Sequence, residues 1–194
     1  MAKRVLLING HPDPRSSTFI GALADAYAAG AKTGGHEVRR LDIGALDIDF
    51  LHSAAEFTEA PRDAAMKAAQ DDISWAQHVV FIFPLWLAAP PAKLKAFLEQ
   101  TFRYGFALPK ESKGFPRGLL GGRSARVIAT MGMPGLIYRL WFGAAGLRAL
   151  ESGVLRLSGF SPVRRTILGG MGAMNPEIAA KHIKAVADLG RQAL

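Results

Sequence analysis

The most informative pattern in the chain is the unbroken apolar run Val79–Phe83, which leads into a proline-containing loop. Such a run of β-branched and aromatic residues is typical of a strand buried on both faces of a parallel sheet. Pro84 cannot donate a hydrogen bond to a neighbouring strand, so it marks the carboxyl end of that strand. Pro90 and Pro91 suit a helix entry. The apolar face of the helix that follows comprises Leu94, Phe97, Leu98 and Phe102.

The rest of the chain repeats this alternation of strand and helix. Four further strands are predicted at residues 3–9, 36–41, 123–130 and 161–168. Helices are predicted at residues 19–33, 61–75 and 136–157, and a last helix begins after Asn175. Strands that alternate with helices predict a parallel sheet covered on both faces, which is an α/β fold.

Three segments are predicted to be irregular. Residues 42–60 mix acidic and apolar positions and are interpreted as a surface loop. Residues 106–122 are rich in Gly, Pro and Lys, as in a loop that contacts substrate or a partner. The glycines of residues 169–172 predict a flexible loop.

The segment 136–157 is more apolar than one core-facing helix requires, and it is expected to break near Gly143 or Gly153. This composition favours a dimer surface, and a fully buried helix is an equally good interpretation. The apolar positions concerned are Leu140, Trp141, Phe142, Leu147 and Leu150.

Length and composition narrow the class of protein. A chain of 194 residues with 49% hydrophobic residues and 21 glycines is expected to form one globular domain, residues 1–194, with a substantial core. The absence of cysteine excludes disulfides, thiolate metal sites and thiol nucleophiles. The first residues run directly into a strand without a signal peptide, and no run approaches the ~20 apolar residues of a membrane span. We therefore expect a cytoplasmic protein that is not integral to a membrane.

The formal net charge of +8 raises the question of a nucleic-acid partner. The basic residues are dispersed, however, and adjoin only as pairs, among them Arg39–Arg40 and Arg164–Arg165, without a basic tail. A basic surface that attracts anionic cofactors is the better interpretation, so no nucleic-acid partner is expected.

Three loops follow predicted strands, at residues 9–19, 84–88 and 130–138. In an open α/β sheet the carboxyl ends of the strands form the ligand-binding edge. The first loop ends in the hydroxyls of Ser16–Thr18 at a helix start, where free N–H groups and the helix dipole bind phosphate. The other two loops offer apolar side chains and glycines that suit a planar ring. Together the loops predict a flavin nucleotide site.

Other ligand and catalytic motifs are absent from the sequence. Neither a Walker A motif nor G-x-G-x-x-G nor G-x-S-x-G is present. The five histidines show no close metal-ligand spacing, so no metal site is predicted. His11 lies in the first ligand loop and is interpreted as a flavin contact. The other four are interpreted as surface or hydrogen-bonded histidines: His36, His52, His78 and His182.

From about Lys3 to Leu194 the chain resembles the flavodoxin-like NAD(P)H:quinone oxidoreductases, which are also described as modulators of drug activity. The most specific match is residues 75–87, WAQHVVFIFPLWL, which is similar to the family's WAD–hydrophobic–FPLWW segment. Weaker matches are PAKLKAFLE at residues 91–99, RYGFA at 103–107, and LLGGRSAR at 119–126 leading into TMGM at 130–133.

The resemblance implies a flavodoxin-like, doubly wound, five-stranded parallel sheet of order 2-1-3-4-5. It also implies noncovalently bound FMN or FAD, NAD(P)H as co-substrate, and a homodimer. The implied reaction moves a hydride from NAD(P)H through the flavin to a quinone or a similar acceptor. The implied flavin contacts are His11, Ser17, Thr18, Phe19, Gln70, Pro84, Leu85, Trp86, Leu87, Thr130, Met131, Gly132, Met133 and Tyr138.

Tyr138 is the candidate catalytic residue, because it matches a tyrosine that faces the hydride-transfer pocket in mammalian relatives and could donate a hydrogen bond to substrate. Near Tyr138 the chain differs from those relatives in two ways. Ala144 occupies the position of the histidine that those relatives carry, so a relay from Tyr138 to histidine is not available in the same form. A Thr-Met-Gly-Met loop also replaces their loop of two threonines and two glycines.

Two other functions are compatible with this resemblance. Some relatives are ancillary regulatory subunits of membrane potassium-efflux systems, and the apolar segment 136–157 could contact such a partner. A flavodoxin-type electron carrier is the other alternative. It is disfavoured because those carriers are typically acidic, whereas this chain is basic.

Overall fold

The computed structural model describes residues 1–15, 17–111, 114 and 116–194. Its five strands form one parallel sheet in the order β2-β1-β3-β4-β5, which confirms the order implied by the resemblance. The strands are β1 Arg4–Asn9, β2 Glu37–Asp42, β3 His78–Pro84, β4 Ser124–Thr130 and β5 Val163–Leu168.

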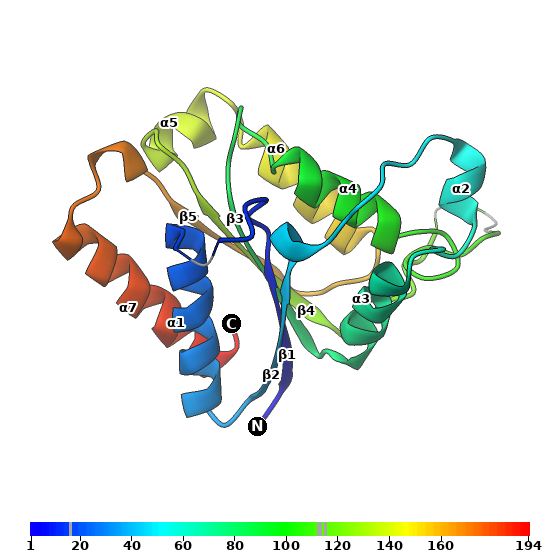
Figure 1. Ribbon diagram of the computed structural model, residues 1–194, viewed down its shortest axis with the longest axis horizontal. Helices are drawn as coiled ribbons and strands as arrows, with labels where there is room; N and C mark the ends of the chain where they lie inside the picture. Colours follow the sequence, from blue (N-terminus) through cyan, green and yellow to red (C-terminus); the bar gives the residue numbers. More distant parts are fainter. Residues whose placement is uncertain (16, 112–113, 115) are drawn as a thin grey trace.

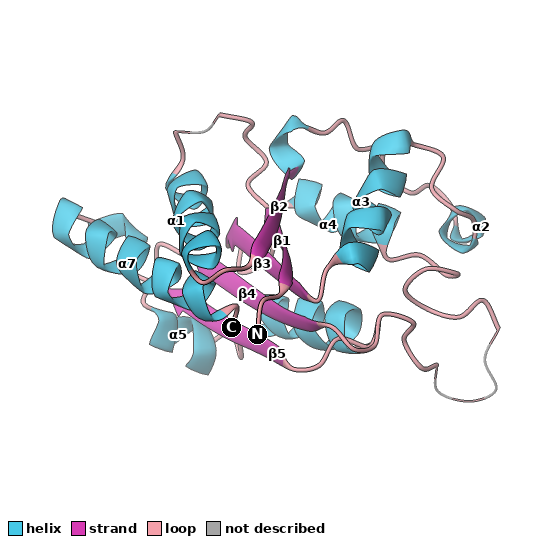
Figure 2. Cartoon of the chain, turned by 90° about the horizontal axis from the view of Figure 1, so that it is seen from below, coloured by secondary structure: helices cyan, strands magenta, loops and turns pink. Residues whose placement is uncertain are grey.

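Helices cover both faces of the sheet (Figures 1 and 2). One face carries α1 Phe19–Thr33 and α7 Pro176–Gln192. The other carries α3 Ala64–Trp75, α4 Ala92–Thr101, α5 Gly135–Leu140 and α6 Ala145–Arg148. Shorter elements are the 3₁₀ turns η1 Ile43–Ala45 and η3 Met171–Ala173, helix α2 Ala54–Thr58, and the π-helix η2 Ala149–Arg156.

Strand β3 is the centre of the core, as its apolar run predicts, and every residue in it is buried. Because side chains alternate along a strand, its residues divide between the two apolar layers. Val79, Phe81 and Phe83 pack in the layer under α3 and α4, whereas Val80 and Ile82 pack in the layer under α1 and α7. The core therefore holds β3 between β1 and β4, which fixes where its carboxyl end emerges.

Helices α1 and α7 touch each other backbone to backbone. A Cβ atom built on Gly30 would lie 2.0 Å from the carbonyl oxygen of Ala187, and one built on Gly190 would lie 2.2 Å from that of Tyr27. Neither distance is compatible with a side chain, so the close approach depends on both glycines.

The predicted surface loop at 42–60 is more ordered than its sequence pattern suggested, since it contains η1 and α2. Helix α4 anchors it through long side chains. Lys93 Nζ donates to the carbonyl of Gly44 at 2.8 Å, and Gln100 Nε2 donates to the carbonyl of Asp49 at 2.8 Å. These contacts join residues about fifty positions apart, so local periodicity could not reveal them.

One predicted helix begins later in the structure than its sequence suggested. Helix α3 begins at Ala64 rather than at Pro61, because the Asp63 side chain caps it by accepting hydrogen bonds from the amides of Ala65 and Met66.

The predicted helix 136–157 breaks at Gly143, which is one of the two sites where a break was expected. The next residue, Ala144, has a positive φ of 50°. The predicted helix does not break at Gly153, which lies within η2. Its apolar residues are divided: Leu147 and Leu150 are buried, whereas Leu140 and Trp141 are 77% and 84% exposed. The predicted flexible loop 169–172 includes the start of η3.

Within the ranges that the structure describes, no helix combines the length and the apolar character needed to cross a bilayer.

Candidate functional site

The three predicted ligand loops leave the sheet at one edge, the upper edge in Figure 1. They follow β1, β3 and β4, which are neighbours in the sheet. Pro84 pairs with Thr130 at the strand ends, and the Leu85 amide donates to the Thr130 carbonyl at 2.7 Å. The ring centroids of His11 and Trp86 are 5.8 Å apart, edge to face, which brings the first and second loops into contact.

Hydrogen bonds between residues two positions apart organise the first loop. The His11 amide donates to Asn9 Oδ1 at 3.1 Å, and the Asp13 amide donates to His11 Nδ1 at 3.1 Å. Because Nδ1 accepts, a neutral His11 ring carries its hydrogen on Nε2. The loop therefore fixes both the orientation of this imidazole and the nitrogen that can donate to a ligand.

One carboxylate lies within this loop. Hydrogen bonds from the Arg15 guanidinium and amide to Asp13 lower the pKa of that carboxyl to about 2. Asp13 is therefore ionised under ordinary conditions, and its charge would repel a phosphate if Arg15 did not offset it. The Asp13–Arg15 pair makes this part of the loop electrically balanced.

The first loop ends at the start of α1. Thr18 caps the helix, since its side chain accepts from the Gly21 amide at 3.1 Å. Among the residues that the structure describes, the first-turn amides of Phe19 and Ile20 have no acceptor, and they lie at the positive end of the helix dipole. Ser17 is exposed beside them. This donor set fits a phosphate group; Ser16, the third predicted capping hydroxyl, lies outside the described residues.

The second and third loops enclose a cavity of about 430 Å³. Its walls are almost entirely apolar, and a Cβ atom built on Gly132 would meet nothing within 4 Å, so the ligand side of that residue is open. A cavity with these walls fits a planar aromatic ring. Its lining residues are Leu85, Leu87, Ala88, Met131, Gly132, Met133, Tyr138 and Phe142. Thr130 and Met131 are themselves buried, at 6% and 5% exposure.

The second loop contains a tight turn, Trp86–Ala89. The Trp86 amide donates to the Ala89 carbonyl and the Ala89 amide donates to the Trp86 carbonyl, both at 3.0 Å. The two central residues, Leu87 and Ala88, have positive φ values of 49° and 63°. Glycine and asparagine normally occupy such positions, and other residues there cost roughly 1–3 kcal/mol each.

Tyr138 is buried and hydrogen-bonded to this turn. It is 1% exposed, its hydroxyl donates to the Ala88 carbonyl at 3.0 Å, and the Leu147 amide donates to the hydroxyl at 3.3 Å. The one hydroxyl hydrogen is thus already used. The ring of Tyr138 lines the cavity, and its predicted hydrogen bond to substrate stays a prediction.

Gln70 lies apart from these loops. It is on α3, and its Nε2 donates to the Thr101 carbonyl at the end of α4, at 2.8 Å. It does not line the cavity. Gln70 therefore does not join the loop residues within a single copy of the chain, and its flavin contact stays a prediction.

His78 is neither on the surface nor fully hydrogen-bonded, contrary to the sequence interpretation. Its side chain is completely buried in β3; Nδ1 lies 2.7 Å from Ser124 Oγ, and Nε2 has no partner among the described residues. Burial lowers its pKa to about 3, with further contributions from nearby Lys3, Arg126 and Arg164. His36 does match the interpretation, because its Nδ1 accepts from the Lys3 amide.

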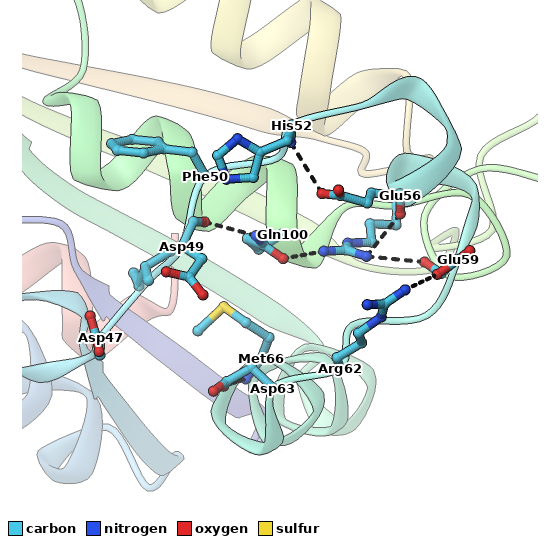
Figure 3. Close-up of a pocket in the computed structure, with 12 residues that line it drawn as sticks. Asp47, Asp49, Phe50, His52, Glu56, Glu59, Arg62, Asp63, Met66 and Gln100 are labelled. Carbon is cyan, nitrogen blue, oxygen red and sulfur yellow. Dashed lines mark hydrogen bonds and ion pairs between the residues drawn. The ribbon is translucent and has the colours of Figure 1, made fainter.

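A second cavity, of about 270 Å³, lies between the segment 47–63, α3 and the end of α4 (Figure 3). The buried Arg103 guanidinium crosses it: Nη1 donates to the Glu56 carbonyl at 2.9 Å and Nη2 donates to the Gln100 side chain. Gln100 in turn holds Asp49. These polar groups bind one another and keep the 47–63 segment against α4, so we assign the cavity a structural role.

The chain matches a family model described as flavodoxin-like fold over residues 3–192. It is 28% identical over 155 residues to a ribosyldihydronicotinamide dehydrogenase-like protein of Penicillium crustosum, a match that covers 66% of this chain and 57% of that protein. It is 29% identical over 126 residues to an FMN-dependent NADH:quinone oxidoreductase of Alcanivorax borkumensis, covering 60% of this chain and 63% of that one. The chain thus spans less than two thirds of the length of both curated relatives.

The fold is also found in a solved structure, the NAD(P)H:quinone oxidoreductase from Methanothermobacter marburgensis. That chain superposes with a TM-score of 0.81 and 22% sequence identity, over 98% of each chain. The sheet order, the ligand edge and the match over nearly the whole length agree: the chain belongs to the family with the flavodoxin-like fold.

Proposed function

We propose that this protein is a flavin-dependent oxidoreductase that transfers a hydride from NAD(P)H to quinones or similar acceptors. The observation that supports it best is the contact of His11 with Trp86, which joins a phosphate-binding helix start to an apolar, ring-sized cavity on one edge of the sheet. The Alcanivorax relative is named as an FMN-dependent NADH:quinone oxidoreductase, and the Penicillium relative is named as a dehydrogenase-like protein of a reduced nicotinamide riboside.

Different residues are proposed to bind the phosphate and the ring of the cofactor. The free amides of Phe19 and Ile20 hold the cofactor phosphate at the positive end of α1. Leu85, Met133 and Phe142 form apolar walls that exclude water from the ring. When bound, the flavin supplies the hydride-transfer chemistry. His11 lies beside Trp86 at the junction of the two parts of the site, and its Nε2 is the ring nitrogen left to donate a hydrogen bond to the ligand.

FMN is the flavin that we propose, because the Alcanivorax relative is FMN-dependent. The test is to mix purified protein with equimolar FMN or FAD, remove unbound flavin, and record the absorbance spectrum and the flavin mass. We expect a yellow protein that carries FMN and that oxidises NADH or NADPH with a simple benzoquinone. A protein that retains neither flavin would refute the proposal, and a flavin protein with a stable semiquinone but no quinone turnover would instead indicate an electron carrier.

We also propose that two copies of the chain associate through the ligand edge. Several large apolar side chains are exposed together there, and clustered exposed apolar side chains mark interaction surfaces. They lie on α5, just after it, and on the Trp86–Ala89 turn, next to the cavity. They are Trp86, Leu87, Leu136, Ile137, Leu140, Trp141 and Phe142, with exposures from 41% to 102%. A second copy over this patch would close the open side of the cavity.

The association can be tested by sedimentation equilibrium. We expect a dimer for the natural chain and a shift to monomer for the double substitution Leu140→Ser with Trp141→Ser. Phe50→Ser is the control, because Phe50 is 61% exposed but lies outside the patch. A natural chain that sediments as a monomer at micromolar concentration would exclude the proposed dimer.

A further inference from the structure

The Trp86–Ala89 turn has a conformation that its own residues do not favour. A two-residue turn with two positive φ values normally contains Asn-Gly, whose backbones tolerate that region. Here the central residues are Leu87 and Ala88, with φ values of 49° and 63°. Leu87 is also fully exposed, so no packing of its own side chain compensates. Something outside the turn must therefore hold it.

Two contacts from the segment after β4 supply that support. The Tyr138 hydroxyl donates to the Ala88 carbonyl, and the same hydroxyl accepts from the amide of Leu147, which lies in α6. Gly146 lies directly beneath: a Cβ atom built on it would be 2.2 Å from the Ala88 carbonyl oxygen and 2.8 Å from the Ala89 Cα. The turn thus rests on the α5–α6 backbone, and one hydroxyl bridges the two.

We propose that Tyr138 is a positioning residue, which holds the strained Trp86–Ala89 turn in the shape that forms one wall of the cavity, and that it does not donate a proton or a hydrogen bond to the acceptor. The second part follows from the hydroxyl having one hydrogen, which the Ala88 carbonyl receives. The effect of Tyr138 on flavin and acceptor binding rests on the proposed function. The support that Tyr138 gives to the turn does not, because it depends only on contacts within the chain.

Among the described residues that line the cavity, no other side chain could replace Tyr138 as a donor. Its remaining lining residues are aliphatic, sulfur-containing or aromatic, or are glycine. Ala144, which occupies the position of the relatives' histidine, is a buried alanine. The turn therefore contributes the shape of the cavity wall and no proton donor. A substitution that loosens the turn is expected to weaken the binding of flavin or acceptor and to leave proton transfer unchanged.

The test is a cycle of four proteins: the natural chain, Tyr138→Phe, the double change Leu87→Asn with Ala88→Gly, and all three substitutions together. Asn-Gly favours the turn by itself, so the hydroxyl should become dispensable in that background. The first measurement is amide hydrogen exchange of Trp86 and Ala89 by NMR on flavin-free protein. Tyr104→Phe is the matched control, because it removes a hydroxyl from a tyrosine remote from the turn.

In the natural background we expect Tyr138→Phe to speed exchange of the two turn amides about 10-fold, as expected for losing a buried hydrogen bond. It should also raise the FMN dissociation constant or the quinone KM by about the same factor, with the pH profile of kcat unchanged. In the Asn-Gly background both effects should fall below about 2-fold.

Two results would overturn the assignment. Turn amides that exchange equally fast with and without the hydroxyl would show that Tyr138 does not hold the turn, whether or not the protein binds flavin. A loss of kcat of about 100-fold or more that persists in the Asn-Gly background, with FMN binding unchanged, would identify Tyr138 as a proton donor. Failure to bind flavin at all would refute the proposed function while leaving the exchange result to judge the turn.

Discussion

Replacing Gly30 by alanine is expected to lower the free energy of unfolding by about 2–3 kcal/mol. Glycine to alanine within a helix usually has the opposite effect and stabilises by up to about 1 kcal/mol. The sign reverses here because the new Cβ would lie 2.0 Å from the Ala187 carbonyl oxygen. That atom belongs to the backbone of α7, so the whole helix must move away from α1 to make room.

Gly153→Ala is the matched control. It lies in a helical segment, and a Cβ atom there would meet nothing within 4 Å. Urea unfolding followed by circular dichroism should show the Gly30 variant less stable and the Gly153 variant as stable as the natural chain or slightly more so. If Gly30→Ala is neutral or stabilising, α1 and α7 do not meet backbone to backbone as the structure indicates.

Much of the fold was predictable because β3 is buried on both faces. A continuous apolar run has few alternative placements, and Pro84 marks where it ends, so the strand and the loop that leaves it followed from the sequence. The neighbouring strands alternate with helices in the same way, and the ligand edge follows from parallel topology. The placement of His11 near Trp86 is a consequence of this geometry.

Contacts between distant segments were not predictable in the same way. The sequence interpretation treated residues 42–60 as a loop. The residues of that segment do not indicate that the side chains of Gln100 and Arg103 donate hydrogen bonds to its carbonyls. Gly30 likewise looks like a weak point of a helix until α7 is placed against it. In each case the decisive partner is far along the chain, where periodicity carries no information.

Tyr138 shows the same limit within the site. The resemblance predicts a tyrosine at the ligand pocket, and Tyr138 lines the cavity, but which atom accepts its hydroxyl hydrogen depends on the unusual backbone of Ala88. Positive φ values at leucine and alanine have no signature in the sequence, because those residues disfavour that region. Strain of this kind becomes visible only in a structure, and it often marks functional segments.

Acidification from pH 6.5 to 4 is expected to destabilise the protein by roughly 3 kcal/mol through His78 alone. The pKa of this histidine falls from 6.5 to about 3 in the folded chain, chiefly because burial disfavours the charged ring. Below pH 6.5 the unfolded chain therefore takes up a proton that the folded chain does not. The stability due to neutral His78 is complete above pH 6.5 and is lost progressively as pH falls toward 3.

His78→Asn removes the titration and keeps a side-chain group that can bond Ser124, so it should flatten the fall in stability between pH 6.5 and 4. Other acidic groups titrate in both proteins, and the difference between the two curves isolates the histidine. Ser124→Ala is the control: it removes the 2.7 Å contact to Nδ1 but leaves the buried imidazole, so its curve should keep the slope of the natural chain. Urea midpoints measured every half pH unit decide the matter. Parallel curves for the natural chain and His78→Asn would mean that the buried ring is not the group that resists protonation.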